Sequence, residues 1–157
     1  MIETISHITI VVRDVEKTGH FLRTIFDAQE VYDGSKKNFS LSYEKFFMVG
    51  GVWMAVMEGE PLPERSYNHV AFRVSDLEFD DYVSRIKKLG VDIRPGRDRV
   101  GGEGRSIYFY DYDNHLFELH TGTIDERLAC YSKGVKGALK GARAAASANG
   151  TRRRLFK

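Results

Sequence analysis

The chain has 157 residues, a formal net charge of +2 and one cysteine, Cys130. This length suits one compact domain or two small halves, and a lone cysteine excludes an internal disulfide. No stretch approaches the roughly 18 apolar residues of a membrane span, and no basic region followed by an apolar run opens the chain. We therefore expect a cytoplasmic protein that binds neither membrane nor nucleic acid.

The basic charge is concentrated at the C-terminal end. From Lys133 onward there are eight Lys or Arg residues and no acid, so the preceding residues carry a net charge of −6. This end is rich in Gly, Ala and Ser and has too little apolar surface to offset the entropy of ordering. We predict a folded domain over residues 1–131 and a flexible, solubilising tail over residues 132–157. A nucleic-acid or membrane contact by the three arginines at 152–154 is the weaker alternative.

The first half of the domain reads as a strand, a helix and further strands. Residues 7–12 alternate apolar and polar side chains, as in a half-buried strand. Asp14 can cap a helix with apolar side chains at helical spacing between Val15 and Phe26. Three short segments broken by turn residues follow and predict strands: "FSLS" (39–42), "KFFMVG" (45–50) and "GVWMAVMEG" (51–59).

The second half repeats this order. "NHVAFRVSDLE" (68–78) matches "SHITIVVRDVE" (6–16) without gaps at an offset of 62, which places His69 on His7. Ser75 and Glu78 have capping-box spacing before a second helix, and Gly90 is a stop signal. Strands are then predicted in "GVDIRP" (90–95), "SIYFYD" (106–111) and "HLFELHTG" (115–122).

The repeat predicts an α+β fold of paired βαβββ modules, at about residues 4–59 and 66–122. The ends of the modules also correspond, since "WMAVMEG" aligns with "LFELHTG". In this alignment Glu118 stands where the first module has Ala55. One carboxylate shared by two halves suits one metal site rather than two.

Three side chains on these strands predict a metal site. His7 and His69 open equivalent strands, and Glu118 lies on the last strand. Two imidazoles and a carboxylate, with coordination positions left open, suit a divalent ion such as Mn, Fe, Zn or Ni. His120 is an alternative ligand, but we favour a supporting or strand-face role for it.

At this point the chain resembles a known family. The motifs "SHITIVVRD", "FSLSYEKFFMVGGVWMAVMEGE", "ERSYNHVAF", "GEGRSIYFYDYDNHLFELHTGT" and "ERL" resemble those of the vicinal-oxygen-chelate superfamily and, within it, FosX-type fosfomycin-resistance hydrolases. The resemblance spans residues 1 to about 131. It implies a cupped mixed sheet, a homodimer that exchanges modules, and Mn²⁺ held by His7, His69 and Glu118.

The resemblance also implies the reaction, which is addition of water to the oxirane of fosfomycin. The family's water-activating base matches Glu44 in "SYEKFF". Opening an epoxide with water requires a base for the proton and an electrophile for the developing alkoxide. A carboxylate near a bound metal ion satisfies the first requirement, and the metal ion satisfies the second.

The implied substrate is a small phosphonate dianion, which needs cationic and hydroxyl donors. The family's positions for the phosphonate pocket match Tyr67, Ser106, Tyr108 and Arg127. Trp53 aligns with an aromatic that flanks the pocket in relatives, and a core role is the alternative for it. Thr9, two residues after His7, shares the face of His7, and we expect it to contact the epoxide oxygen. Thiol-transferase relatives place a lysine upstream of the Gly-rich loop, where a gapless count finds Asp98. We expect Arg99 to supply that cation instead.

Other functions remain open at this stage. A thiol transferase could add glutathione or another thiol to fosfomycin at the same metal site, but Glu44 and the missing lysine argue against it. A different reaction on the same triad, such as Fe²⁺-dependent ring cleavage or isomerisation, is a second rival. A non-enzymatic protein that sequesters the drug is a third, and it would need no base.

Overall fold

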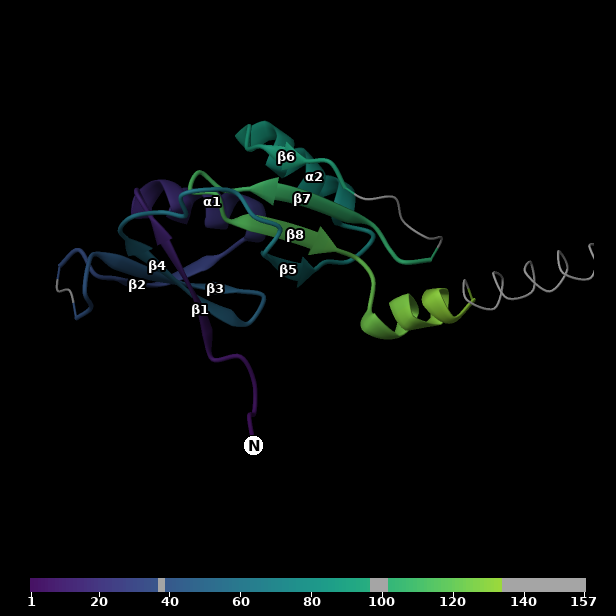
Figure 1. The fold of residues 1–157 in the computed structure, drawn as a ribbon. Coiled ribbons are helices and arrows are strands. Elements are labelled where there is room, and N and C mark those ends of the chain that lie inside the picture. The colour runs from purple at the N-terminus through teal and green to yellow at the C-terminus, as the bar shows by residue number, and fades with distance from the viewer. Residues whose placement is uncertain (37–38, 97–101, 134–157) are drawn as a thin grey trace, which may run out of the picture. The chain divides into compact units, whose positions relative to one another are not determined.

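The computed structural model describes residues 1–36, 39–96 and 102–133 (Figure 1). The chain divides into two compact units. The first unit contains every strand together with helices α1 and α2. The second contains described residues 102–104 and 122–133, including a helix over residues 124–133. Most of the predicted tail therefore lies outside the described residues, and its flexibility stays a prediction.

The first module forms a four-stranded sheet, which we call sheet A. Its elements are β1 (His7–Val12), α1 (Val15–Phe26), β2 (Gln29–Asp33), β3 (Glu44–Val49) and β4 (Val52–Glu58). The strand order is β1-β4-β3-β2, so β1 lies at an edge. β1 runs parallel to β4, and the other pairs are antiparallel.

The second module forms sheet B with the same topology. Its elements are β5 (His69–Arg73), α2 (Phe79–Leu89), β6 (Ile93–Arg94), β7 (Ser106–Tyr110) and β8 (Leu116–His120). The order is β5-β8-β7-β6, with β5 parallel to β8 and at an edge. The prediction of an α+β fold with paired βαβββ modules is confirmed.

The strand registers agree with the alignment of the two halves. Thr9 pairs with Ala55 across β1 and β4, and Ala71 pairs with Glu118 across β5 and β8. Because paired residues share a face of the sheet, Ala55 and Glu118 occupy equivalent positions. The asymmetry that the sequence predicted therefore lies on corresponding faces of the two sheets.

The ends of the helices were predicted with mixed success. Asp14 caps α1, since its carboxylate accepts a hydrogen bond from Lys17 N at 2.9 Å. Gly90 ends α2 with a φ of 72°, a conformation that suits glycine. The capping box of Ser75 and Glu78 is wrong: the chain first turns at residues 76–78, and α2 begins with no side-chain cap.

One strand was also predicted in the wrong place. Residues 39–42 form no strand, and the strand that follows α1 is β2, from Gln29 to Asp33. In residues 39–42 the apolar side chains Phe39 and Leu41 are 74% and 98% exposed, so their alternation buries no face. β2 instead pairs with β3 through a bulge between Glu30 and Tyr32.

Helix α1 packs against both sheets and gives them a common core. A Cβ on Gly19 would lie 2.9 Å from the Phe47 ring of β3, so α1 approaches sheet A closely. On the other side, the ring of Phe21 lies 5.6 Å from Phe117 of β8 and 6.1 Å from Phe109 of β7. Phe21 is fully buried. The two modules are therefore joined by aromatic packing as well as by the chain.

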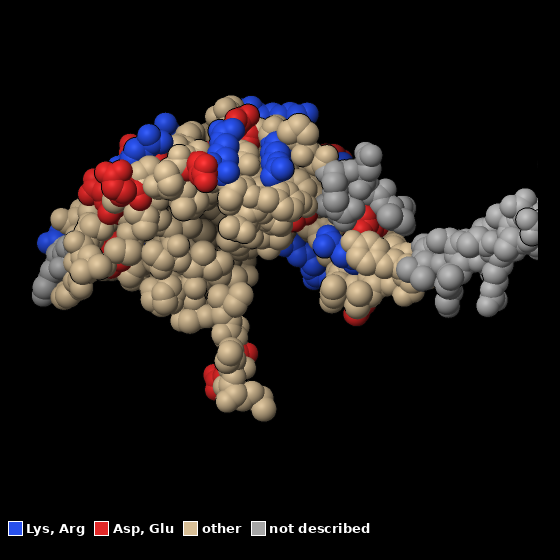
Figure 2. Space-filling model, in the orientation of Figure 1, with Lys and Arg blue, Asp and Glu red and all other residues tan. Residues whose placement is uncertain are grey.

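Charged side chains are concentrated on one side of the molecule in this view. Lys, Arg, Asp and Glu side chains gather in the upper part, where Figure 1 places α1, α2 and β6 (Figure 2). An ion pair also links the modules, since Nε of the exposed Arg13 lies 2.7 Å from Oδ1 of the buried Asp113. Each sheet also has a face turned away from α1, and that face is available to form a functional site.

Candidate metal centre and substrate site

Most of the predicted polar residues of the second module share one face of sheet B. The pairings Tyr108–Glu118 and Ser106–His120 join β7 to β8 on that face. His69 lies on the same face at the start of β5, two positions before Ala71, the partner of Glu118. Residues on the other face, including Phe117 and Leu119, belong to the core. Because successive side chains of a strand point to opposite faces, the core residues lie on one face of sheet B and the predicted site residues lie on the other.

His69 and Glu118 form the centre of this face. His69 Nε2 lies 3.1 Å from Glu118 Oε2, and His69 Nδ1 lies 2.8 Å from the carbonyl oxygen of Tyr67. A carbonyl oxygen only accepts, so Nδ1 carries a proton and donates to Tyr67 O, and Nε2 is the ring nitrogen directed at the carboxylate. An imidazole nitrogen and a carboxylate oxygen placed this close together are suited to binding one divalent cation, and a backbone carbonyl on the far ring nitrogen is the usual support of a metal-binding histidine.

The surroundings of Glu118 favour its charged form. Its side chain is 5% exposed, and burial alone would raise its pKa. Hydrogen bonds from Ser106 and Tyr108, with the nearby imidazoles of His69 and His120, lower the pKa below its usual value. The carboxylate is thus held as an anion, as metal binding requires.

Tyr108 and Tyr67 extend this face beside the metal ligands. Burial, followed by hydrogen bonds to Tyr67 and Glu118, raises the pKa of Tyr108. Its hydroxyl therefore stays protonated and remains a donor. The rings of Tyr67 and Tyr108 lie 6.0 Å apart, and Tyr67 lies 5.1 Å from the His69 ring.

The sequence missed Arg94, which adds a cation to the same face. Arg94 in β6 pairs with Tyr108 in β7, and its guanidinium lies 4.6 Å from the centre of the Tyr67 ring. The sequence signal was partial: "DIRP" lies in a predicted strand, but only the pairing of β6 with β7 shows that Arg94 shares the face of Tyr108. Arg99, the predicted cation, lies outside the described residues.

The corresponding face of sheet A carries one histidine among apolar groups. His7 pairs with Trp53, and their rings lie 4.4 Å apart. Thr9 and Ala55 come next on this face, and Phe46 of β3 packs on Trp53 at 5.0 Å. The face therefore offers an imidazole beside an aromatic wall.

Glu44 lies at the start of β3 on this same face of sheet A. It pairs with Met57 of β4, and Met57 pairs with Val11 of β1, two residues beyond Thr9. Glu44 is only 7% exposed, although it is an acid at the end of a strand. Its backbone is held by a hydrogen bond from Gly34 N to Glu44 O at 2.9 Å.

The three predicted metal ligands do not meet within the described part of one chain. Across residues 1–36, 39–96 and 102–133, no three His, Cys, Asp or Glu side chains lie close enough together to hold a metal ion. His69 and Glu118 meet, whereas His7 stays on sheet A. A cavity of about 350 Å³ does bring Thr9 of β1 and His69 of β5 to its walls.

Arg127 belongs to the second unit and is described with that unit alone. The helix over residues 124–133 begins with a capping box, because Thr123 Oγ1 accepts from Glu126 N and Glu126 Oε2 accepts from Thr123 N. Arg127 N donates to the Thr123 carbonyl in the first turn. The predicted contact of Arg127 with the phosphonate stays a prediction.

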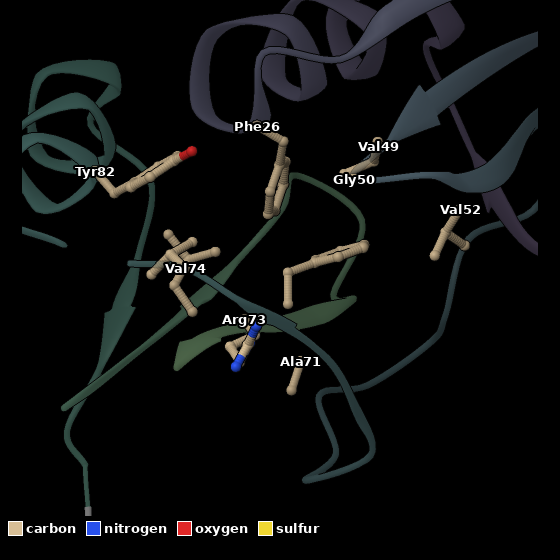
Figure 3. A pocket seen from close by; sticks show the side chains of 10 residues that line it. Phe26, Val49, Gly50, Val52, Ala71, Arg73, Val74 and Tyr82 are labelled. Atoms are coloured by element: carbon tan, nitrogen blue, oxygen red, sulfur yellow. The ribbon is translucent and has the colours of Figure 1, made fainter. Parts of the chain in front are cut away.

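A second cavity of the first unit contains none of the predicted site residues. It measures about 400 Å³, and its walls come from both helices and from strands of both sheets. Figure 3 shows Phe26 and Tyr82 on one side of it, with Ala71 and Arg73 across from them. Arg73 is the charged residue among the ten that line it.

Comparison with known families agrees with this arrangement. The sequence profile of the Glyoxalase/Bleomycin resistance protein/Dioxygenase superfamily matches residues 4–119. The chain belongs to this superfamily. The matched range takes in both modules except His120, the last residue of β8.

Among members of the superfamily, the chain is similar to proteins named for fosfomycin resistance. It is 59% identical over 138 residues to the fosfomycin resistance protein FosX of Mesorhizobium japonicum, which covers 88% of this chain and 99% of that protein. It is 37% identical over 137 residues to the metallothiol transferase FosB of Staphylococcus epidermidis, covering 85% and 94%. The predicted resemblance to FosX-type proteins is confirmed.

A solved structure extends the comparison to ligands. It is a Glu-to-Gln variant of FosX from Listeria monocytogenes, in complex with Mn(II) and 1S,2S-dihydroxypropylphosphonic acid. It aligns with a TM-score of 0.78 at 57% identity, over 82% of this chain and 99% of that one. That FosX therefore holds both a manganese ion and a diol phosphonate on the fold described here.

No helix within the described ranges is long and apolar enough to cross a bilayer.

Proposed function

We propose that this chain is a Mn²⁺-dependent hydrolase that opens the epoxide of fosfomycin with water to give a diol phosphonate, and so confers resistance to the antibiotic. The observation that carries the proposal is the pair of His69 and Glu118, whose Nε2 and Oε2 atoms lie 3.1 Å apart on a sheet face of hydroxyl donors. The similarity to FosX, one of which is solved with Mn(II) and a diol phosphonate, supports the choice of metal and product.

The metal ion would be held by His69 and Glu118 of one chain and by His7 of a second copy. Two observations support this homodimer: His7 does not join the other ligands in the described part of one chain, and the edge strands β1 and β5 remain available for pairing. When bound, Mn²⁺ supplies Lewis-acid stabilisation of the charge that develops on the oxirane oxygen.

Glu44 would act as the general base. It is the buried carboxylate on the face of sheet A that carries His7 and Thr9. Its carboxylate would take a proton from water as the water oxygen attacks a ring carbon from the side opposite the breaking C–O bond. That carbon inverts, and the oxirane oxygen leaves it as an alkoxide on the neighbouring carbon. The proton held by Glu44 would then pass to this alkoxide, directly or by exchange with solvent, which gives the diol and regenerates the base.

The phosphonate would be recognised by the polar face of sheet B. Arg94 supplies a guanidinium there, and Tyr108 and Tyr67 supply hydroxyls. A guanidinium and neutral hydroxyls are suited to the oxygen atoms of a phosphonate dianion. Arg99 and Arg127 stay as predicted further cations. Thr9 and Trp53 would line the epoxide end of the pocket beside His7.

Phosphorus NMR of fosfomycin tests the proposal. The metal-stripped protein is reloaded with Mn²⁺ and assayed with and without glutathione, beside Glu44→Gln and the matched control Glu58→Gln, which changes an exposed acid of the same sheet. We expect a diol phosphonate signal without thiol in the wild type and in Glu58→Gln. In Glu44→Gln we expect its rate to fall by about 10²–10⁴-fold, the usual contribution of a general base.

Each alternative gives a different spectrum. A new signal that requires glutathione would place the protein among thiol transferases. Drug sequestration would leave the fosfomycin signal chemically unchanged and insensitive to Glu44→Gln. A diol signal of equal rate in wild type and Glu44→Gln would keep the hydrolase and reject Glu44 as its base. The cytoplasmic location stays a prediction.

A further inference from the structure

A chain of hydrogen bonds runs from the backbone carbonyl of Arg105, the residue before β7, to the carboxylate of Glu118. His120 Nδ1 lies 3.0 Å from the carbonyl oxygen of Arg105 and 2.8 Å from Ser106 Oγ. Ser106 Oγ in turn lies 2.5 Å from Glu118 Oε1. His120, Ser106 and Glu118 share one face of sheet B, so the chain of contacts follows the register of β7 and β8.

The chemistry of these atoms fixes where the protons are. The Arg105 carbonyl oxygen and the ionised Glu118 carboxylate only accept hydrogen bonds. His120 Nδ1 must therefore carry a proton, which it shares between Arg105 O and Ser106 Oγ. Ser106 has one proton, and it must go to Glu118 Oε1. The reverse order would leave acceptors facing each other at both ends, at 3.0 Å and at 2.5 Å.

We propose that His120 is a positioning residue that acts through Ser106 to orient Glu118 as a metal ligand. Ser106 engages Oε1, which leaves Oε2 directed at His69 Nε2, 3.1 Å away. His120 fills the acceptor side of the Ser106 hydroxyl, so that the hydroxyl donates in one direction. Partners of this kind set the affinity of a site for its metal.

This inference rests on the proposed function, and it changes one part of it. Ser106 was predicted from the family to bind the phosphonate. A serine hydroxyl has one proton, and here that proton is given to Glu118. Ser106 therefore contributes to metal binding. The hydroxyl of Tyr108 also donates to Glu118, so Arg94 and Tyr67 are left as the donors to the phosphonate.

The test measures Mn²⁺ affinity from the electron paramagnetic resonance signal of the free ion. We expect Ser106→Ala and His120→Leu each to weaken Mn²⁺ binding by about 10–100-fold, the usual cost of removing an outer partner of a ligand. The double variant should be no weaker than the worse single one, since His120 acts through Ser106. His120→Asn places an amide N–H where the imidazole Nδ1–H was, and it should bind Mn²⁺ within about 3-fold of wild type.

The companion measurement is the KM for fosfomycin at saturating Mn²⁺, with thermal unfolding of each apo variant to verify the fold. We expect KM within about 3-fold of wild type, because the phosphonate donors are intact. A raised KM with unchanged Mn²⁺ affinity would mean that Ser106 binds the phosphonate after all. If the losses of Mn²⁺ affinity of the two single variants multiply in the double variant, His120 acts independently of Ser106. Either result overturns the inference. A wild type that binds Mn²⁺ but leaves fosfomycin intact would instead reject the proposed function.

Discussion

The two modules share a topology but differ in the chemistry of their open faces. Sheet B carries His69, Glu118 and Ser106 in a connected set of hydrogen bonds. The same face of sheet A carries His7 against Trp53, with Ala55 at the position equivalent to Glu118. The two sheets are thus similar scaffolds with different side chains. In the proposed site, sheet B would hold two of the metal ligands, and sheet A would hold the third ligand and the base.

The largest expected effect comes from substituting one proposed metal ligand on sheet A and one on sheet B, each in a separate variant of the chain. We expect His7→Ala and Glu118→Gln each to lower fosfomycin hydrolysis by at least about 100-fold, because each removes a metal ligand. A heterodimer of the two variants, purified through two different tags after co-expression, should regain about half of the wild-type activity per dimer, since one of its two sites would be intact.

Two controls complete this experiment. Each homodimeric variant, carried through the same purification, should stay inactive. A mixed dimer that remains as inactive as its parents would mean that His7 and Glu118 of one chain serve the same site. Failure to obtain any mixed dimer by tandem purification would reject the homodimer itself.

A second prediction concerns the core that joins the modules. Phe21→Ala removes a fully buried ring that contacts Phe109 and Phe117 of the other module. We expect the free energy of unfolding to fall by about 3–5 kcal/mol, as for other buried Phe-to-Ala changes. Because α1 belongs to both cores, urea denaturation should remain a single transition when followed by circular dichroism and by Trp53 fluorescence. Two separate transitions would show that the modules unfold independently.

The smallest expected effect concerns the core-facing sides of β3 and β7, where a lysine in β3 corresponds to an isoleucine in β7. Lys45 pairs with Val56 in sheet A, whereas the equivalent Ile107 pairs with Leu119 in sheet B. The Lys45 side chain is 6% exposed, and its ammonium lies 2.8 Å from a Glu16 oxygen and 3.3 Å from both Glu30 and Asp33 oxygens.

We expect Lys45→Met to lower the free energy of unfolding at pH 7 by about 1–2 kcal/mol, between the values for exposed and fully buried ion pairs. The hydrogen bond from Lys45 lowers the pKa of Glu16 below 4.5. The Lys45–Glu16 interaction therefore stabilises the fold above about pH 4.5, and this stabilisation is lost as the pH falls. The difference in free energy of unfolding between wild type and Lys45→Met should therefore become smaller below pH 4.5. Lys45→Arg is the control, and a difference that grows on acidification would contradict this assignment.

The parts of the fold that follow from local pattern were predictable. The period of two put His7 and His69 on faces opposite the apolar residues, and the alignment of the halves put Ala55 opposite Glu118; the registers agree with both. The cap at Asp14 and the stop at Gly90 depend on neighbouring residues alone, and both were found.

The features that the sequence did not predict correctly depend on contacts between segments that are distant in the chain. Residues 39–42 alternate like a strand, but β3 pairs with β2 instead, so Phe39 and Leu41 stay exposed. Arg94 joins the site face only because β6 pairs with β7, and the proton order of Ser106 depends on His120 fourteen residues later. The packing of α1 against both sheets, and the separation of His7 from the other ligands within one chain, have no local signal at all.

The position of β1 and β5 at the edges of their sheets has a consequence for how the protein would behave in a cell. In the proposed homodimer, the site exists only while two chains are paired, so specific activity depends on protein concentration. At low expression, chains below the dissociation constant of the dimer would lack a complete site and leave the antibiotic untouched. Resistance would then rise more steeply than in proportion to gene dosage, as expected for a catalyst whose formation is second order in the chain.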